Sequence, residues 1–76
     1  MNKLRRKSLT EVAAKIEELR DMLESLRDEE QEYMDNTPEN LWASERYIKA
    51  EEAVDSLDYA LDNLSDAMEN IEEATN

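Results

Sequence analysis

The chain has 76 residues, with 21 acidic and 9 basic side chains that give a formal net charge of -12, and it contains no Cys, His or Gly. The absence of Cys excludes disulfides and thiolate metal sites, and the absence of Gly excludes glycine-rich loops that hold phosphate or calcium. Without His, the chain cannot form the di-iron sites of helix bundles or a histidine-based catalytic centre. We therefore expect no enzyme, no cofactor and no metal site.

The low mean hydropathy of -0.93 is typical of disordered segments, but the apolar residues of this chain are regularly spaced. No run of about 18 apolar residues occurs, so we expect no membrane span. The basic residues 1–7 are followed by Ser8 and Thr10 where a signal peptide has its apolar stretch. We expect one small cytoplasmic domain over residues 1–76.

The first half of the chain has the apolar spacing of a helix that packs against another helix, with alternating steps of three and four residues. Ser8 and Glu11 match a capping box, which predicts a helix over about residues 8–34. Glu30 interrupts the seam, where a glutamate is more typical of a wet end of a bundle than of a metal ligand. The seam that we expect to face the second helix consists of Leu9, Val12, Ile16, Leu19, Leu23, Leu26 and Tyr33.

Residues 35–40 hold the single proline and the densest cluster of turn-forming residues, so the turn is expected there. Thr37 before Pro38 is typical of a helix start, and Ser44 offers a competing start. We expect the second helix over about residues 41–74.

The second helix repeats the heptad rule without interruption, at Tyr47, Ala50, Val54, Leu57, Leu61, Leu64, Met68 and Ile71. Beside this seam, Ala53, Ala60, Ala67 and Ala74 recur every seven residues, and such small side chains let a neighbouring helix approach closely. The pattern predicts an all-α fold, an antiparallel helical hairpin of two long amphipathic helices.

Two helices cover only one side of each other, so we expect the hairpin to assemble into a homo-oligomeric helix bundle, a coiled-coil-like arrangement. Alternatively, a helix of a different protein covers the exposed apolar side of the hairpin. The predicted oligomer seam consists of Val54, Leu57, Leu61, Leu64, Met68 and Ile71, together with Ala53, Ala60 and Ala67.

Charge is segregated along the chain, because residues 1–7 carry four bases and residues 50–76 carry nine acids and no base. In a hairpin these ends meet, so we expect ion pairs between the basic set Lys3, Arg5, Arg6 and Lys7 and the acidic set Glu69, Glu72 and Glu73. A basic segment this short on so acidic a chain does not predict nucleic-acid binding.

An acidic band follows the outer side of the second helix. Such a band usually serves as a solvated face, but it also steers association with a basic protein surface. The residues that we predict to bind a protein partner are Asp55, Asp58, Asp62, Asp66 and Glu69, with Trp42 as an aromatic anchor.

The segment 41–49 gathers the single Trp, a Tyr and two bases. The first role that we predict for Trp42 is to cover Tyr33 or Met34 at the end of the core. Its other possible role is in a ligand site, where an aromatic ring stacks on a base and cations meet phosphate. That site would consist of Trp42, Arg46, Tyr47 and Lys49.

The stretch Pro38-Glu39-Asn40-Leu41, then Ser44 with Arg46-Tyr47, then residues 50–54, resembles small uncharacterised acidic proteins of gut Gram-positive bacteria and their prophages. The resemblance implies a short accessory protein with no known activity, and in a phage an inhibitor of a host defence system. A designed hairpin is the competing origin, although the irregular turn and the seam Glu30 favour a natural sequence.

Three hypotheses follow from the sequence. The first is a non-enzymatic protein-binding module, the second is an oligomer that sequesters a small ligand such as a nucleotide, and the third is a passive scaffold.

Overall fold

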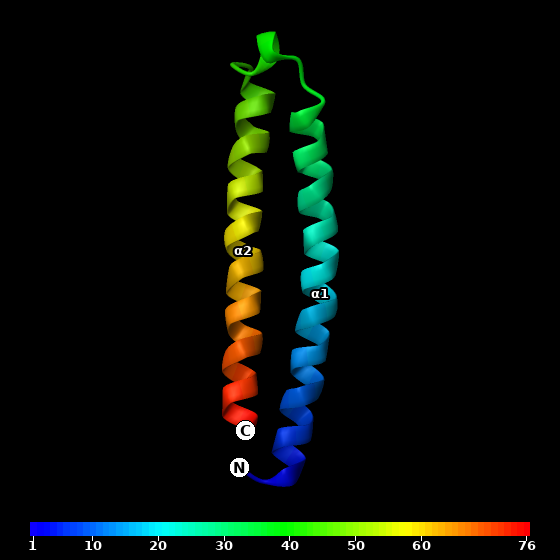
Figure 1. The fold of residues 1–76 in the computed structure, drawn as a ribbon, viewed down its shortest axis with the longest axis vertical. Coiled ribbons are helices and arrows are strands. Elements are labelled where there is room, and N and C mark those ends of the chain that lie inside the picture. Colours follow the sequence, from blue (N-terminus) through cyan, green and yellow to red (C-terminus); the bar gives the residue numbers. More distant parts are fainter.

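The computed structural model describes all 76 residues as two long antiparallel helices joined by a short turn (Figure 1). Helix α1 spans Lys3–Asp35, the 3-10 helix η1 spans Glu39–Leu41, and α2 spans Glu45–Thr75. The Cα atoms extend over 59 × 15 × 14 Å, so the molecule is a rod. The predicted all-α helical hairpin is confirmed. Neither long helix contains a stretch apolar enough to cross a membrane.

Helix α1 begins at Lys3 because Asn2 caps it, its side-chain oxygen accepting a hydrogen bond of 2.7 Å from the Arg5 amide. The predicted capping box at Ser8 and Glu11 is therefore wrong, since both residues lie inside the helix. Asparagine caps as well as serine does, and the basic residues between the two candidates are good helix formers.

Helix α2 begins after Ser44, whose hydroxyl accepts a hydrogen bond of 3.2 Å from the Tyr47 amide. Thr37 instead belongs to the end of α1, because its hydroxyl donates to the Tyr33 carbonyl at 2.7 Å. Pro38 precedes only the short helix η1. Of the two starts that the sequence offered, Ser44 is the one that α2 uses.

The core of the hairpin is thin and lies on α2. Only three residues are buried, Ala50, Val54 and Leu61, with 4%, 6% and 3% of their surface exposed. The other members of the α2 seam are half-buried, namely Tyr47, Leu57, Leu64, Met68 and Ile71. The predicted seam of α2 therefore packs within the chain, against α1.

The predicted seam of α1 is wrong at every second position. Val12, Leu19, Leu26 and Tyr33 are 46%, 57%, 57% and 38% exposed, so they lie beside the contact with α2 and not in it. The half-buried positions of α1 include a column that the apolar pattern did not select. This column consists of Ala13, Arg20, Arg27 and Met34, next to the shared column Leu9, Ile16, Leu23 and Glu30.

Two arginines explain this rotation of α1. The Arg20 Nε donates to the Ser65 hydroxyl at 2.7 Å, and the Arg27 Nε lies 3.3 Å from the Asp58 carboxylate, although without hydrogen-bond geometry. Their aliphatic stems cover apolar surface while their charged groups reach polar partners on α2. Arginines therefore take seam positions that a count of apolar residues assigns to leucine and valine.

The predicted ion pairs between the two ends of the chain do not form. The first turns of α1 extend past the end of α2 (Figure 1), and no basic residue among 1–7 pairs with an acid. The early start of α1 at Lys3 carries these bases beyond the acids of α2.

We predict that Leu61→Ala lowers the free energy of unfolding by about 2 to 3 kcal/mol, because it removes a buried side chain from a core of three residues. The matched control is Leu4→Ala, the same chemical change at a position that is 79% exposed, which should cost less than about 0.5 kcal/mol. Urea unfolding followed by circular dichroism measures both. Equal losses would contradict the placement of the core on α2.

Candidate functional site

A shallow hollow on α2 gathers three acidic residues around an exposed aromatic ring. It has a volume of about 320 Å³ and is lined by Asp55, Asp58, Tyr59 and Asp62. Tyr59 is 72% exposed, and its side chain makes no hydrogen bond or stacking contact within the chain. We call this group the acidic hollow.

The acidic hollow has the chemistry of a receptor for a cation. An aromatic face attracts Lys and Arg side chains, and carboxylates beside it add charge-assisted hydrogen bonds. Asp58 already faces Arg27 across the hairpin, at 3.3 Å, which shows that one guanidinium fits at the edge of this group. Asp55 and Asp62 make no ion pair within the chain and remain available.

Tyr59 is the residue of this site that the sequence analysis missed. Its signal was visible, because the residues seven positions away on either side, Glu52 and Asp66, are acidic, and Tyr59 is the one aromatic residue of that column. An aromatic residue with no place on the apolar seam has no packing role to explain it.

The structure does not bring all the predicted partner-binding residues together. Asp66 and Glu69 are exposed further along α2 and do not line the acidic hollow. Trp42 lies in the turn, between η1 and α2, and contributes nothing to the acidic hollow.

Trp42 packs on the start of α2. Its ring stacks on Tyr47 with the centroids 5.9 Å apart and an interplanar angle of 18°, and its indole N–H donates to the Thr37 carbonyl at 3.0 Å. Trp42 was predicted to cover Tyr33 or Met34 at the end of the core, but the side chain on which it stacks is Tyr47. Half of the Trp42 surface, 49%, remains exposed.

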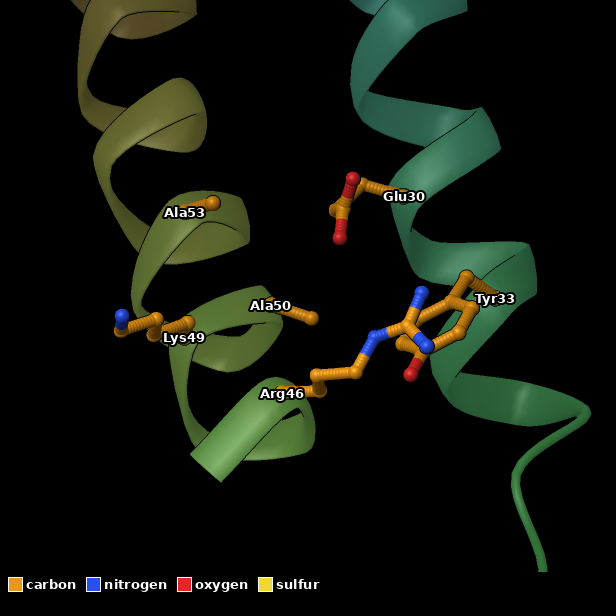
Figure 2. A pocket seen from close by; sticks show the side chains of 6 residues that line it. All are labelled: Glu30, Tyr33, Arg46, Lys49, Ala50 and Ala53. Atoms are coloured by element: carbon orange, nitrogen blue, oxygen red, sulfur yellow. The ribbon is translucent and has the colours of Figure 1, made fainter. Parts of the chain in front are cut away.

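The four predicted ligand-binding residues are divided between two places. Arg46 extends from α2 across to α1, where its guanidinium carbon lies 5.8 Å from the centre of the Tyr33 ring (Figure 2). Arg46 and Lys49 line an open hollow of about 390 Å³, whereas Trp42 and Tyr47 line no part of it. The full lining of this turn-end hollow is Glu30, Tyr33, Arg46, Lys49, Ala50 and Ala53.

Glu30 projects into the turn-end hollow beside Arg46, as its seam position predicted (Figure 2). It forms no ion pair within 4.0 Å. Lys49, the other cation of this hollow, pairs with Glu45 of its own helix at 3.1 Å. No group of three or more acidic side chains in the structure is arranged to hold a metal ion.

Comparisons with protein-family models, with curated proteins and with solved structures gave no match to this chain. Candidate functions of this chain are therefore inferred from the surfaces of the hairpin itself.

Proposed function

We propose that this protein is a non-enzymatic binding protein whose acidic hollow receives a Lys or Arg side chain of a protein partner. The observation that carries the proposal is Tyr59, an aromatic ring that is 72% exposed and sits among Asp55, Asp58 and Asp62. A large aromatic side chain gains nothing for folding in that position, and aromatic residues are the side chains that most often anchor partners.

The charge of the chain supports a basic partner. A net charge of -12 on a rod draws a basic protein toward it from a distance. Asp66 and Glu69 continue the acidic surface beyond the hollow, so they contribute to this long-range attraction without contacting the anchored cation. Such attraction weakens as salt increases.

The absence of an enclosed pocket favours binding over catalysis. The four hollows of the structure are all open to solvent, whereas acid-base catalysis by carboxylates depends on a site that excludes water. The resemblance to prophage proteins adds a biological context. In a phage, the basic partner of this chain is a component of a host defence system, which the protein inhibits by occupying it.

Self-association is a part of the same proposal. A hairpin that buries only three of its 76 residues gains stability when another helix pair covers its exposed apolar side chains. A homo-oligomer would present several copies of the acidic hollow and would bind a repeated basic surface more tightly than one copy does.

Capture of a nucleotide in the turn-end hollow is the second candidate function. Arg46 and Lys49 line this hollow together with the aromatic Tyr33, which favours an anion with a stacking group. Glu30 in the same hollow opposes it, because its carboxylate repels phosphate. The stacking of Trp42 on Tyr47 also leaves no gap for a base between these two rings.

A thermal-shift titration with ATP tests the second candidate. Nucleotide capture predicts that the melting temperature rises with ATP concentration and that Arg46→Ala abolishes the rise. No change in melting temperature at millimolar ATP would contradict nucleotide capture and would leave the acidic hollow as the site.

For the first candidate, we predict that a triple substitution of Asp55, Asp62 and Asp66 by Asn weakens capture of the basic partner from an extract of the source cells by at least tenfold. The matched control replaces Glu17, Glu18 and Asp21 on α1 by their amides, which removes the same charge from another surface. We expect the control to retain most of the binding, because its acidic hollow is intact. Quantitative mass spectrometry of the captured proteins at low salt measures both.

Two further results decide the proposal. Tyr59→Ser should reduce capture although it leaves the net charge unchanged, because it removes the aromatic face of the hollow. Equal losses in the α1 and α2 variants, or capture that persists unchanged in molar salt, would contradict a specific acidic site. If the protein is a scaffold without a partner, no captured protein should depend on the acidic residues that either variant replaces.

A further inference from the structure

One edge of the hairpin carries an apolar column with no partner. Val12, Leu19, Leu26 and Tyr33 recur every seven residues along α1, and between 38% and 57% of each is exposed. Met22, which is 63% exposed, lies beside the column at its midpoint. The hairpin leaves a large part of each of these side chains uncovered, and exposed apolar patches mark interaction surfaces.

The same edge of α2 carries small side chains. Tyr33 and Ala53 line one hollow, so the α1 column and the alanine column Ala53, Ala60 and Ala67 lie on one side of the molecule. The opposite edge is marked by the contacts of Arg20 with Ser65 and of Arg27 with Asp58. We call the α1 column and the alanine column together the lateral face.

We propose that the lateral face is a homodimer interface in which the large column of each copy packs on the alanine column of the other. This inference rests on the self-association included in the proposed function, and it specifies the face and the symmetry. The twofold axis runs parallel to the helices, so both turns lie at the same end of the dimer. Each α1 then lies antiparallel to the α2 of the second copy.

The register of the hairpin sets large residues against small ones in this arrangement. The contacts of Arg20 with Ser65 and of Arg27 with Asp58 fix which residues of α1 and α2 are level. An axis parallel to the helices preserves these levels in the second copy. Continued along the columns, the register sets Leu19 beside Ala67, Leu26 beside Ala60 and Tyr33 beside Ala53 of the second copy, and small side chains opposite large ones allow close helix packing.

The charge distribution of α2 is compatible with a second copy of this acidic chain as the occupant. Although α2 carries nine acids after residue 50, none lies in the alanine column or in the column on its outer flank. The flanking column consists of Lys49, Ser56, Asn63 and Asn70, and Arg46 continues the alanine column toward the turn. An acidic helix therefore docks there without meeting like charge.

The exposed acids on the outer side of α1 do not meet acids of α2 in this arrangement. The same register sets Glu29 and Glu32 level with Leu57 and Val54 of the second copy, where the outer flank of the alanine column carries the neutral Ser56. A second copy therefore docks without bringing like charges into contact at this level.

The area is sufficient for a stable dimer. The chain exposes 5994 Å², whereas a compact monomer of this mass exposes about 4,800 Å². The lateral face extends about 32 Å from Val12 to Tyr33 and is about 20 Å wide with side chains, so two copies bury roughly 1,200 Å² in total. Specific, stable interfaces bury about 1,200 to 2,000 Å² in total, so this area lies at the lower end of their range.

Mixed single-cysteine variants of the purified protein test the proposal, and the absence of native Cys removes competing thiols. Leu26→Cys and Ala60→Cys, made distinguishable in mass by a tag, are mixed, allowed to exchange subunits and oxidised under mild conditions. Because the two cysteines are on different chains, their disulfide reports only the contact between copies. We expect at least tenfold more mixed disulfide than either variant forms with itself, since a disulfide requires Cα atoms within about 7 Å.

The control mixture pairs Leu4→Cys with Ala60→Cys, because Leu4 is 79% exposed but lies outside the lateral face. It should form no more mixed disulfide than the same variants do in urea. Two results would overturn the proposal. One is a mixed Leu26–Ala60 product no greater than in urea, and the other is efficient self-linking of Met22→Cys, which places α1 over α1 about a perpendicular axis.

The assay contains no partner protein. A negative result in the disulfide assay would therefore contradict the dimer interface only. The acidic hollow would still be tested separately by the capture experiment.

Discussion

The contact between one side of α1 and one side of α2 is the constraint on which the other features depend. In a two-helix hairpin each helix covers a single side of its neighbour, and here that contact buries only Ala50, Val54 and Leu61. Because Arg20 and Arg27 occupy one edge of the contact with α2, the α1 column lies outside this contact and forms part of the lateral face. The same rotation that completes the hairpin thus creates the surface that we assign to a second copy.

The sequence predicted the elements, the turn and the seam of α2, but it misplaced the seam of α1. Along α2 the apolar residues form one heptad seam without interruption, so the side that faces α1 is well defined. Along α1 the band is wider, and its limits depend on arginine stems that pack like apolar groups although they count as polar. The cap at Asn2 was missed, and the good helix formers between Asn2 and Ser8 are consistent with a helix that starts before the predicted capping box.

The candidate functional surfaces were harder to predict because they depend on which side chains the hairpin leaves exposed. Acidic composition identified Asp55, Asp58 and Asp62, but it did not identify Tyr59 as the residue they surround. Arg46 lies over the Tyr33 ring of α1, whereas Trp42 stacks on Tyr47. Residues that are close in the sequence therefore have different partners in the structure. The acidic hollow lies toward the Arg27 edge and the lateral face lies on the other edge. A dimer formed through the lateral face therefore leaves both acidic hollows open to a basic partner.

Sedimentation equilibrium of the purified protein distinguishes a hairpin that is half of an assembly, held together by apolar contacts, from a hairpin that folds alone. Over a range of protein concentrations, we expect a mass of about twice 8.9 kDa at low and at high salt, because salt screens charge but does not weaken apolar contacts. A folded, helical species of 8.9 kDa at every concentration would show that the proposed dimer does not form.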